Sequence, residues 1–211
     1  MHDYYSARAA EYDKIYLKPE RQPNLREMET WISRVFEGRS VLEIACGTGY
    51  WTQFFAPRAA RVLALDAAEE TLKIARARVP PSKVEFVQGD AYEIPAATGS
   101  FDAAFAGFWW SHIPLNRVET FLCGLHQALE PGATVVFIDN RFVQGSSTPI
   151  SLQDAEGNTY QTRALSDGTT HRVLKNFPAR AELLEAVRRY SQSAAYREWD
   201  YYWALEYTLA A

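Results

Sequence analysis

Short apolar segments alternate with helix-like segments along the first 140 residues of this chain. Each apolar segment is hydrophobic on both faces, which is typical of strands that helices cover on both sides. Strands and helices that alternate in this way form a parallel sheet with right-handed crossovers. The sequence therefore predicts a doubly wound α/β fold. The predicted strands are 39–45, 61–66, 83–90, 100–110 and 133–140, and the predicted helices are 50–59, 68–79 and 116–132.

The pattern changes after residue 140. Residues 159–177 predict two strands around an Asp-Gly turn, residues 178–191 predict a helix, and the strand-like residues 194–210 should complete the sheet edge. No repeat or low-complexity linker divides the chain, so we expect a single domain. Its expected parts are an N-terminal helical segment (1–35), a core (36–140), a hairpin region (141–177) and a C-terminal helix with strands (178–211).

The composition excludes several classes of function. The 211 residues include 22 Lys and Arg against 26 Asp and Glu, so the chain lacks the excess positive charge typical of nucleic-acid binding. No apolar run approaches the roughly 20 residues that span a bilayer. The two cysteines, Cys46 and Cys123, follow no metal-ligand spacing, so we expect no metal site and no disulfide framework. The first 16 residues are polar and aromatic, unlike a signal peptide, and a cytoplasmic location is expected.

Two glycines follow the first predicted strand and indicate a ligand close to the backbone. Gly47 and Gly49 open a turn into a helix, where backbone N–H groups are exposed. A dinucleotide or S-adenosylmethionine would suit such a turn. The dinucleotide fingerprint needs a third glycine where this chain has Thr52, and Glu43 in the preceding strand would repel a pyrophosphate. The same carboxylate suits the cationic amino and sulfonium groups of S-adenosylmethionine.

Acidic residues end the second and third strands as well. Residues 43–49 follow the pattern acid-x-x-x-Gly-x-Gly, and Asp66 and Asp90 end the next two strands. Residues 101–113 and 128–137 continue with a strand and a helix–Pro-Gly–strand segment. In this order the segments resemble the class I S-adenosylmethionine-dependent methyltransferases. The resemblance implies an enzyme with a Rossmann-like fold, a mainly parallel seven-stranded sheet and S-adenosylmethionine as its cofactor.

The resemblance also implies roles for individual residues. Asp66 would accept hydrogen bonds from both ribose hydroxyls, although it is also a plausible helix cap, and Asp90 would receive the adenine amino group. Ala67 and Leu72 would flank the adenine ring. The cofactor residues expected in the core are Glu43, Ala45, Cys46, Gly47, Thr48, Gly49, Trp51, Asp66, Ala67, Leu72, Asp90, Ala91, Gly107 and Phe108.

Three side chains of the N-terminal segment are further candidates for cofactor binding. Tyr5, Arg8 and Tyr12 fall on one face of a predicted helix, at spacings of three and four residues. This resembles the leading helix of small-molecule methyltransferases, which folds over the cofactor. The resemblance implies that these side chains contact the methionine end and that Arg8 pairs with its carboxylate. The alternative is an ordinary amphipathic helix packed on the sheet.

Two features bear on the methyl acceptor. His112 is a candidate base for a hydroxyl acceptor, or a structural residue before Pro114. Residues 4–13, the glycine turn, residues 109–114 and residues 162–177 together resemble O-methyltransferases that act on hydroxyethylphosphonate, although Cys46 replaces the serine of their glycine turn. That resemblance implies that Arg163, Arg172 and Lys175 bind an anion, with Tyr16 or Tyr12 assisting. An acceptor that is already ionised needs no base, and the alternative for the hairpin is a solvated, charged surface.

The sequence therefore predicts S-adenosylmethionine-dependent methyl transfer to a small organic acceptor. O-methylation of a phosphonate, carboxylate or hydroxyl group is the expected reaction. An NAD(P)-dependent oxidoreductase and a non-catalytic S-adenosylmethionine-binding protein remain as alternatives. The expected partner is a small molecule, with neither nucleic acid nor membrane.

Overall fold

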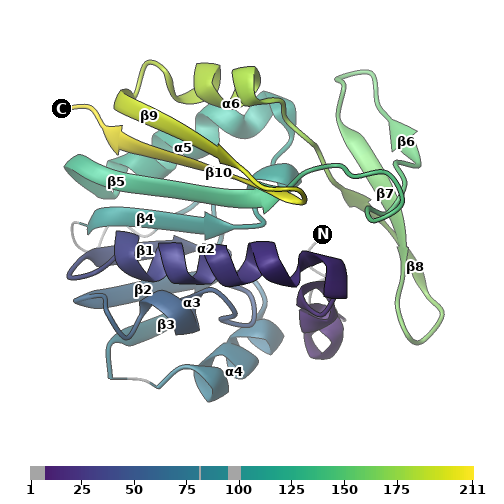
Figure 1. Ribbon diagram of the computed structural model, residues 1–211, viewed down its shortest axis with the longest axis horizontal. Helices are drawn as coiled ribbons and strands as arrows, with labels where there is room; N and C mark the ends of the chain where they lie inside the picture. Colours follow the sequence, from purple (N-terminus) through teal and green to yellow (C-terminus); the bar gives the residue numbers. More distant parts are fainter. Residues whose placement is uncertain (1–7, 81, 95–100) are drawn as a thin grey trace.

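A seven-stranded sheet forms the middle of three layers in the computed structural model, which describes residues 8–80, 82–94 and 101–211 (Figure 1). The strand order is β3-β2-β1-β4-β5-β10-β9, and only the pairs β5–β10 and β10–β9 are antiparallel. The predicted α/β fold with a mainly parallel sheet is therefore confirmed. The strands are β1 Ser40–Ile44, β2 Arg61–Asp66, β3 Val84–Gln88, β4 Phe101–Gly107, β5 Leu129–Asn140, β9 Ser191–Glu198 and β10 Tyr202–Leu209.

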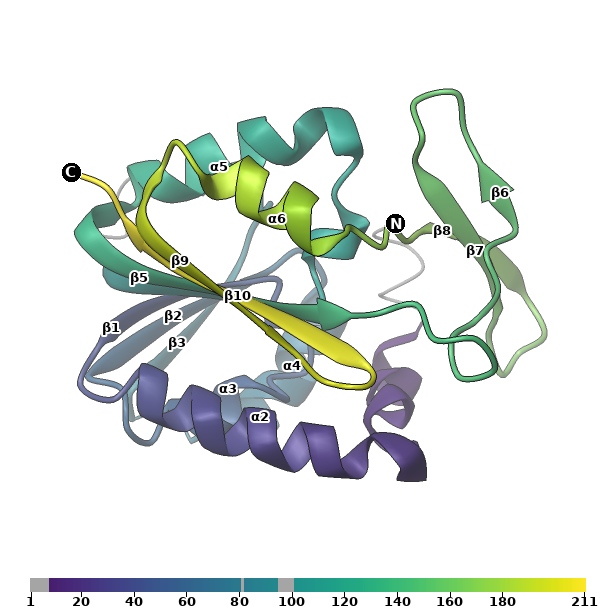
Figure 2. The same ribbon diagram turned by 45° about the horizontal axis from the view of Figure 1, so that its top comes forward.

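Helices cover both faces of this sheet (Figure 2). One face carries α2 Gln22–Val35, α3 Thr52–Phe55 and α4 Glu69–Arg78, and the other carries α5 Val118–Gln127 and α6 Arg180–Val187. Short 3-10 helices complete the chain: η1 Ala9–Tyr16, η2 Pro19–Arg21, η4 Trp110–His112 and η5 Leu115–Arg117. Among the described residues no helix is both long enough and apolar enough to cross a bilayer.

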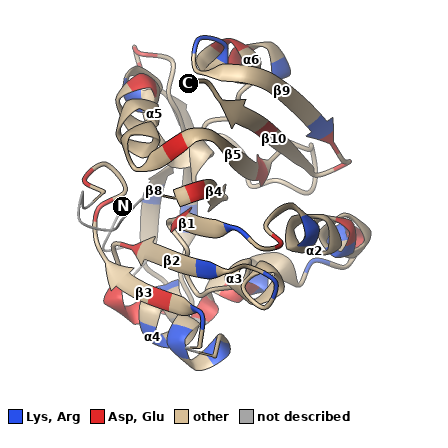
Figure 3. Ribbon diagram, turned by 90° about the vertical axis from the view of Figure 1, so that its left-hand side faces the viewer, with Lys and Arg blue, Asp and Glu red and all other residues tan. Residues whose placement is uncertain are grey.

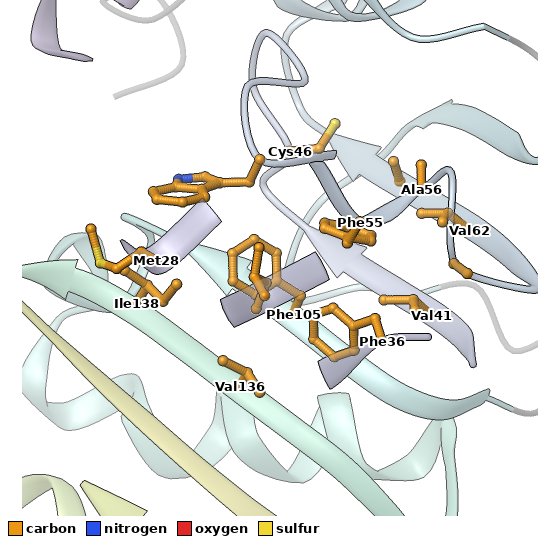
Figure 4. Close-up of a cluster of buried hydrophobic side chains, with 14 of the residues drawn as sticks. Met28, Phe36, Val41, Cys46, Phe55, Ala56, Val62, Phe105, Val136 and Ile138 are labelled. Atoms are coloured by element: carbon orange, nitrogen blue, oxygen red, sulfur yellow. The ribbon is translucent and has the colours of Figure 1, made fainter. Parts of the chain in front are cut away.

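Large side chains fill the space between the sheet and α2 (Figure 4). Phe36 meets Phe55 and Phe105 edge to face at ring-centroid distances of 5.2 and 5.9 Å, and Met28 and Ile138 lie beside them, all fully buried or nearly so. Burying one such side chain stabilises a fold by about 1.5–3 kcal/mol. A second buried cluster lies under α5 and α6, which explains why the central strands are apolar on both faces.

Two predicted helices are shorter in the structure. The helix predicted over 116–132 ends at Gln127, and Pro131 and Gly132 lie inside β5. The pairing of β5 with β4 shifts register between Phe101 and Ala103, and Gly132 adopts φ +83°, so an irregular strand start replaces the helix end. The helix predicted over 50–59 is reduced to α3, because Pro57 follows closely and supplies no backbone N–H.

A small second sheet stands beyond the carboxyl ends of β4 and β5 (Figure 1). Its strands are β6 Leu152–Gln153, β7 Thr159–Ala164 and β8 Thr170–Leu174, in the order β6-β7-β8. β7 and β8 pair antiparallel, and Gly168 in the turn between them has φ +84°. Residues of η1 and of β7 line one cavity together, so both segments border the space beyond the parallel strands.

Residues of both charges, Lys and Arg as well as Asp and Glu, are mixed along α2 and α4 in the coloured ribbon of Figure 3. Pairs such as Arg26 with Glu29 and Arg76 with Glu69 account for part of this pattern. These two helices therefore offer no stripe of a single charge. Lys and Arg side chains gather instead around a cavity, which is described with the site below.

The Gly49→Ala substitution tests how tightly the glycine turn packs on α4. Gly49 has φ +72°, and a Cβ atom there would lie 3.1 Å from Cβ of Ala75 and 3.2 Å from its Cα. Gly38 is the matched control, because its φ is +73° and no atom lies within 4 Å of an added Cβ. Both variants carry the left-handed backbone penalty of about 1–2 kcal/mol. We expect Gly49→Ala to lose about 1–3 kcal/mol more than Gly38→Ala in urea unfolding; equal losses would contradict this packing.

Candidate active site

The turn after β1 is held by the carboxylate that ends β2. Asp66 Oδ2 accepts a hydrogen bond of 2.8 Å from the backbone N–H of Gly47, which has φ +56°. Asp66 Oδ1 accepts from the N–H of Ala68 at 2.9 Å and from Thr71 Oγ1 at 3.0 Å. One carboxylate thus joins the glycine turn to the first turn of α4. The N-cap residue of α4 is Ala68, so Asp66 is not the cap itself but bonds the N–H of the cap residue. A carboxylate can accept further hydrogen bonds from a ligand.

A cavity opens at the carboxyl ends of β1–β4, beside this carboxylate, and is called the turn cavity here. Most of its lining is small or apolar, and Asp66 and Asp90 supply two carboxylates. An apolar slot with acidic groups fits a nucleoside, whose base is flat and whose ribose donates hydroxyl protons. The lining residues are Tyr12, Ala45, Gly47, Leu65, Asp66, Ala67, Ala68, Thr71, Gly89, Asp90, Ala91, Gly107, Phe108, Trp109 and His112.

Nine of the predicted cofactor residues line the turn cavity: Tyr12, Ala45, Gly47, Asp66, Ala67, Asp90, Ala91, Gly107 and Phe108. Six others do not line it and are buried around it: Glu43, Cys46, Thr48, Gly49, Trp51 and Leu72. Arg8 lines the neighbouring cavity described below, and Tyr5 lies outside the described residues. Thr71 and Trp109 are lining residues that the sequence did not indicate. Nothing in the local pattern distinguishes Thr71 from Leu72, and only the orientation of α4 separates them.

Glu43 is buried beneath the turn rather than exposed to the cavity. It is 1% exposed, and its Oε2 accepts a 2.7 Å hydrogen bond from Thr52 Oγ1. Burial raises the pKa of Glu43 to about 8. The carboxyl is therefore mostly protonated at neutral pH. Glu43 was expected to pair with a cationic ligand, but it does not line the cavity. It instead joins β1 to α3 by accepting the hydrogen bond from Thr52.

The helix η1 is fastened to the glycine turn by a polar network. Thr48 Oγ1 donates to Asp13 Oδ1 at 2.6 Å, and Arg78 at the end of α4 donates to the Thr48 carbonyl at 2.8 Å and forms an ion pair with Asp13. Tyr16 stacks on Tyr50 with ring centroids 3.4 Å apart. Tyr16 is buried and lines neither cavity, so its predicted assistance to the acceptor is not reflected in its position.

A second cavity of about 380 Å³ lies between η1, the end of β5 and the β7–β8 hairpin, and is called the hairpin cavity. Six Lys and Arg side chains line it, and its described lining contains neither Asp nor Glu. Polar uncharged groups such as Gln161 and Ser147 supply most of the remaining wall. The six cations are Arg8, Lys14, Lys18, Arg21, Arg163 and Lys175.

The hairpin brings two of its three predicted cations to this cavity. Arg163 lies on the inward face of β7, where its guanidinium donates to Gln161 Oε1 at 2.7 Å, and Lys175 follows β8. Arg172 is exposed and lies over the ring of Tyr160, outside the cavity lining. Neighbouring side chains of a strand point to opposite faces, and the structure shows which of the two faces is inward.

Lys175 is held at the cavity wall by a buried ion pair. Its Nζ donates to Asp139 Oδ1 at 2.9 Å and to Ser111 Oγ at 2.5 Å. Burial acts to raise the pKa of Asp139, but the charge of Lys175, together with the hydrogen bonds from Lys175 and from the Ser111 N–H, brings that pKa below its usual value. A buried pair of this kind contributes little net stability, yet it fixes where its charges lie. Asp139 could not be recognised from the sequence as a site residue, because it is simply the next-to-last residue of an otherwise apolar strand segment.

His112 is kept neutral in this environment. Its Nδ1 lies 2.6 Å from the carbonyl oxygen of Leu174, which can only accept, so Nδ1 carries the proton and Nε2 the lone pair. Burial, with the charges of Lys175 and Arg163, holds the pKa of His112 well below its usual value. The ring is therefore suited to accepting a hydrogen bond from a ligand.

The two cavities meet at three residues. Tyr12, Phe108 and His112 line both the turn cavity and the hairpin cavity. Phe108 has φ +59°, an uncommon conformation for a large residue, and its ring stacks on Tyr202 at 5.6 Å. A ligand in one cavity can thus contact a ligand in the other across a neutral, aromatic junction. Within the described residues no group of three or more His, Cys, Asp and Glu side chains could hold a metal ion.

Comparisons with known proteins agree with this arrangement. A family model described as "Methyltransferase domain" matches residues 41–132. Over its full length the chain is similar to the solved structure of DhpI with SAH, at 30% identity and a TM-score of 0.78, covering 99% of this chain and 94% of that one. The complex of DhpI with SAM and HEP matches at the same identity and TM-score, covering 97% and 94%.

A curated relative is similar over the core alone. Demethylmenaquinone methyltransferase of Lactococcus lactis subsp. lactis (strain IL1403) is 35% identical over 109 residues, which cover 48% of this chain and 42% of that protein. The chain thus spans 42% and 47% of the length of two curated relatives that it matches.

The fold and the turn cavity define a nucleoside-binding enzyme of the Rossmann-like group. The chain belongs to the class I S-adenosylmethionine-dependent methyltransferases, and S-adenosylmethionine is its cofactor. The small lining residues and the two carboxylates of the turn cavity fit the adenosyl part of that cofactor. The oxidoreductase and the non-catalytic protein considered from the sequence are therefore set aside.

The Asp66→Asn substitution tests the role of this carboxylate in holding the adenosyl group. The amide keeps one acceptor oxygen but removes the charge that strengthens hydrogen bonds from ribose hydroxyls. We expect S-adenosylhomocysteine to bind about 10–100-fold more weakly in titration calorimetry, as the loss of one or two such bonds implies. Asp154→Asn, in the small sheet and away from both cavities, is the control. Equal affinities for the two variants would remove Asp66 from the site.

Glu43→Gln tests the buried carboxyl through the pH dependence of stability. The unfolded carboxyl has a pKa near 4.5 and the folded one near 8, so between these values the unfolded chain loses its proton first. The free energy of unfolding of the native chain should therefore fall as the pH rises through this window, by up to about 1.4 kcal/mol per pH unit. Glu43→Gln has no such proton and keeps an acceptor for Thr52.

The measurement is urea unfolding of both proteins, without cofactor, at about pH 5.5 and about pH 7.5. The stability of Glu43→Gln relative to the native chain should increase between the two conditions. A constant difference would show that the folded carboxyl ionises normally.

Proposed function

We propose that this methyltransferase acts on an oxygen atom of a small anionic acceptor, a phosphonate or a carboxylate. The observation that carries the proposal is the charge of the hairpin cavity. Six Lys and Arg side chains line it without an acidic side chain in its described lining, and it joins the cofactor cavity at Tyr12, Phe108 and His112. In an acidic protein, such a concentration of positive charge favours a negatively charged ligand.

The proposal gives the two cavities separate tasks. S-adenosylmethionine supplies a methyl group on a positively charged sulfur. In this proposal Asp66 and Asp90, which line the turn cavity, hold the adenosyl part, and Arg163 and Lys175, which line the hairpin cavity, bind acceptor oxygens. The neutral junction of Tyr12, Phe108 and His112 excludes water from the point where the two ligands meet, so catalysis rests mainly on alignment and desolvation.

The proposed reaction needs no general base. A lone pair of the acceptor oxygen forms the new C–O bond while the C–S bond breaks, and its electrons remain on sulfur. An oxygen that is already anionic has no proton to lose. His112, whose pKa is well below its usual value, is a weak base, and we assign it the role of accepting a hydrogen bond through Nε2. The fixed tautomer places that lone pair without a change of protonation.

The similarity to DhpI supports this choice of acceptor. The DhpI complex contains HEP beside SAM, and the similarity extends over 97% of this chain, the hairpin region included. The demethylmenaquinone methyltransferases match less than half of their own length. Their names point to methylation of a large quinone derivative, for which a cationic wall gives no advantage. Such a molecule is the negative control in the assays below.

Arg163→Ala and Arg172→Ala form a matched pair for testing the anion site. The first removes a cation from the cavity wall, and the second removes one from the opposite, exposed face of the same hairpin. Methyl transfer from labelled S-adenosylmethionine would be measured with 2-hydroxyethylphosphonate, small carboxylic acids, phenols and a demethylmenaquinone analogue. We expect Arg163→Ala to lower kcat/KM for the anionic acceptor by about 10–100-fold. Arg172→Ala should stay within about twofold, because exposed charges contribute little.

Two outcomes would contradict the proposal. One is a preference of the native enzyme for phenols or for the demethylmenaquinone analogue over every anionic acceptor. The other is an equal loss in the two arginine variants, which would show that the cavity charge has no special role. Binding of S-adenosylhomocysteine should be unchanged in both variants, because neither side chain lines the turn cavity.

A further inference from the structure

Arg21, at the end of η2, is a buried cation without a buried counterion. It is 6% exposed, and its guanidinium donates to Asn140 Oδ1 at 3.0 Å and to Ser146 Oγ at 3.0 and 3.2 Å. None of the ion pairs formed by the described residues includes it. Buried arginines are normally paired with a carboxylate, because an isolated buried charge costs several kcal/mol. The exposed carboxylate of Glu20, which accepts a hydrogen bond from Ser146 Oγ at 2.9 Å, balances part of this charge, and a ligand in the cavity would supply a buried counterion.

The position of Arg21 indicates which ligand that is. The side chain lines the hairpin cavity, together with Lys18, whose Nζ donates to the Ser146 carbonyl. Burial and the neighbouring Arg21 lower the pKa of Lys18, so the two cations lie close enough to repel each other. The rings of Tyr201 and Tyr202 lie 5.2 and 5.6 Å from the guanidinium carbon and give it partial compensation only.

Arg21 and Lys18 belong to a different part of the cavity from the transfer junction. Arg21 donates to Asn140 and Ser146, and Lys18 donates to the Ser146 carbonyl, whereas Lys175 donates to Ser111, which precedes His112 in the chain. The wall of the hairpin cavity, of about 380 Å³, therefore carries one pair of cations at Ser146, Arg21 and Lys18, apart from Lys175 beside the neutral His112.

We propose that the acceptor carries two anionic groups, and that Arg21 with Lys18 binds the group remote from the methylated oxygen. The inference rests on the proposed function, and it narrows the substrate class to elongated diacids such as carboxyalkyl phosphonates. Arg21 is a specificity-determining residue in this account. It provides a planar fork of donors, which suits a carboxylate or phosphonate better than a solvated lysine would.

A structural role for Arg21 makes a different prediction. Its hydrogen bonds tie η2 to the end of β5 and to residue 146, so the arginine could serve the fold alone. Ser146→Ala removes the hydroxyl that accepts two of these bonds and leaves the guanidinium in place. A purely structural tie would be weakened in both Arg21→Gln and Ser146→Ala, whereas recognition of an anion depends on the guanidinium.

The experiment compares 3-phosphonopropionate with propylphosphonate as methyl acceptors. The two molecules share one carbon skeleton and differ in the carboxylate at the far end. The native enzyme should favour the diacid in kcat/KM by about tenfold or more. Arg21→Gln should reduce this ratio to about one, Arg21→Lys should give an intermediate ratio because it keeps the charge without the fork, and Ser146→Ala should retain most of the preference. Melting temperature and affinity for S-adenosylhomocysteine, measured on every variant, report on folding and on the cofactor site.

The preference for the diacid over propylphosphonate decides between the outcomes. No preference of the native enzyme for the diacid would overturn the inference, even if Arg21→Gln failed to fold. A preference that survives in Arg21→Gln, or that Ser146→Ala abolishes to the same extent, would also overturn it. If propylphosphonate is methylated and the diacid is not preferred, the second anion site is wrong and the proposed function stands. If neither phosphonate nor any simple carboxylate is methylated, the proposed function itself fails.

Discussion

The carboxylate of Asp66 is the contact on which the cofactor cavity depends. It accepts from Gly47 in the glycine turn and from Ala68 and Thr71 at the start of α4, and so joins two segments that the hydrogen bonds of Arg78 to Thr48 also hold together. Because the strand order reverses beside β1, these segments lie at the switch point where ligands of parallel sheets bind. The close approach of Gly49 to Ala75 completes this wall, since a larger residue would separate the turn from the helix.

Charge is divided between the two cavities according to the chemistry of their ligands. Carboxylates face the adenosyl group in the turn cavity, and cations face the acceptor in the hairpin cavity. Between them lie side chains without charge, and the low pKa of His112 belongs to this pattern. An imidazolium at the junction would repel the cationic sulfur of the cofactor. The buried pair of Lys175 and Asp139 and the network of Asp13, Thr48 and Arg78 hold the two walls in place.

Much of this arrangement could be predicted from the sequence, and the remainder depends on tertiary contacts. The strand 61–66 and the position of Asp66 follow from hydrophobic pattern alone, because a buried strand that ends in an acid is a local signal. The helix predicted over 116–132 was wrong at its end, since Pro131 and Gly132 also suit an irregular strand. Side chains alternate between the two faces of each hairpin strand, but the sequence alone does not show whether the face of Arg163 or that of Arg172 points to the cavity. Arg21 and Asp139 gave no signal, because only the fold brings their segments to the cavity.

The central claim is that an anionic acceptor binds in the hairpin cavity and meets the cofactor at Tyr12, Phe108 and His112. A crystal structure of the enzyme with S-adenosylhomocysteine and 2-hydroxyethylphosphonate tests it most directly. The account predicts the adenosyl group beside Asp66 and the phosphonate oxygens at Arg163 and Lys175, with one of them facing the sulfur across the junction. A phosphonate bound on the outer surface, or a hairpin cavity that stays empty at saturating concentration, would contradict it.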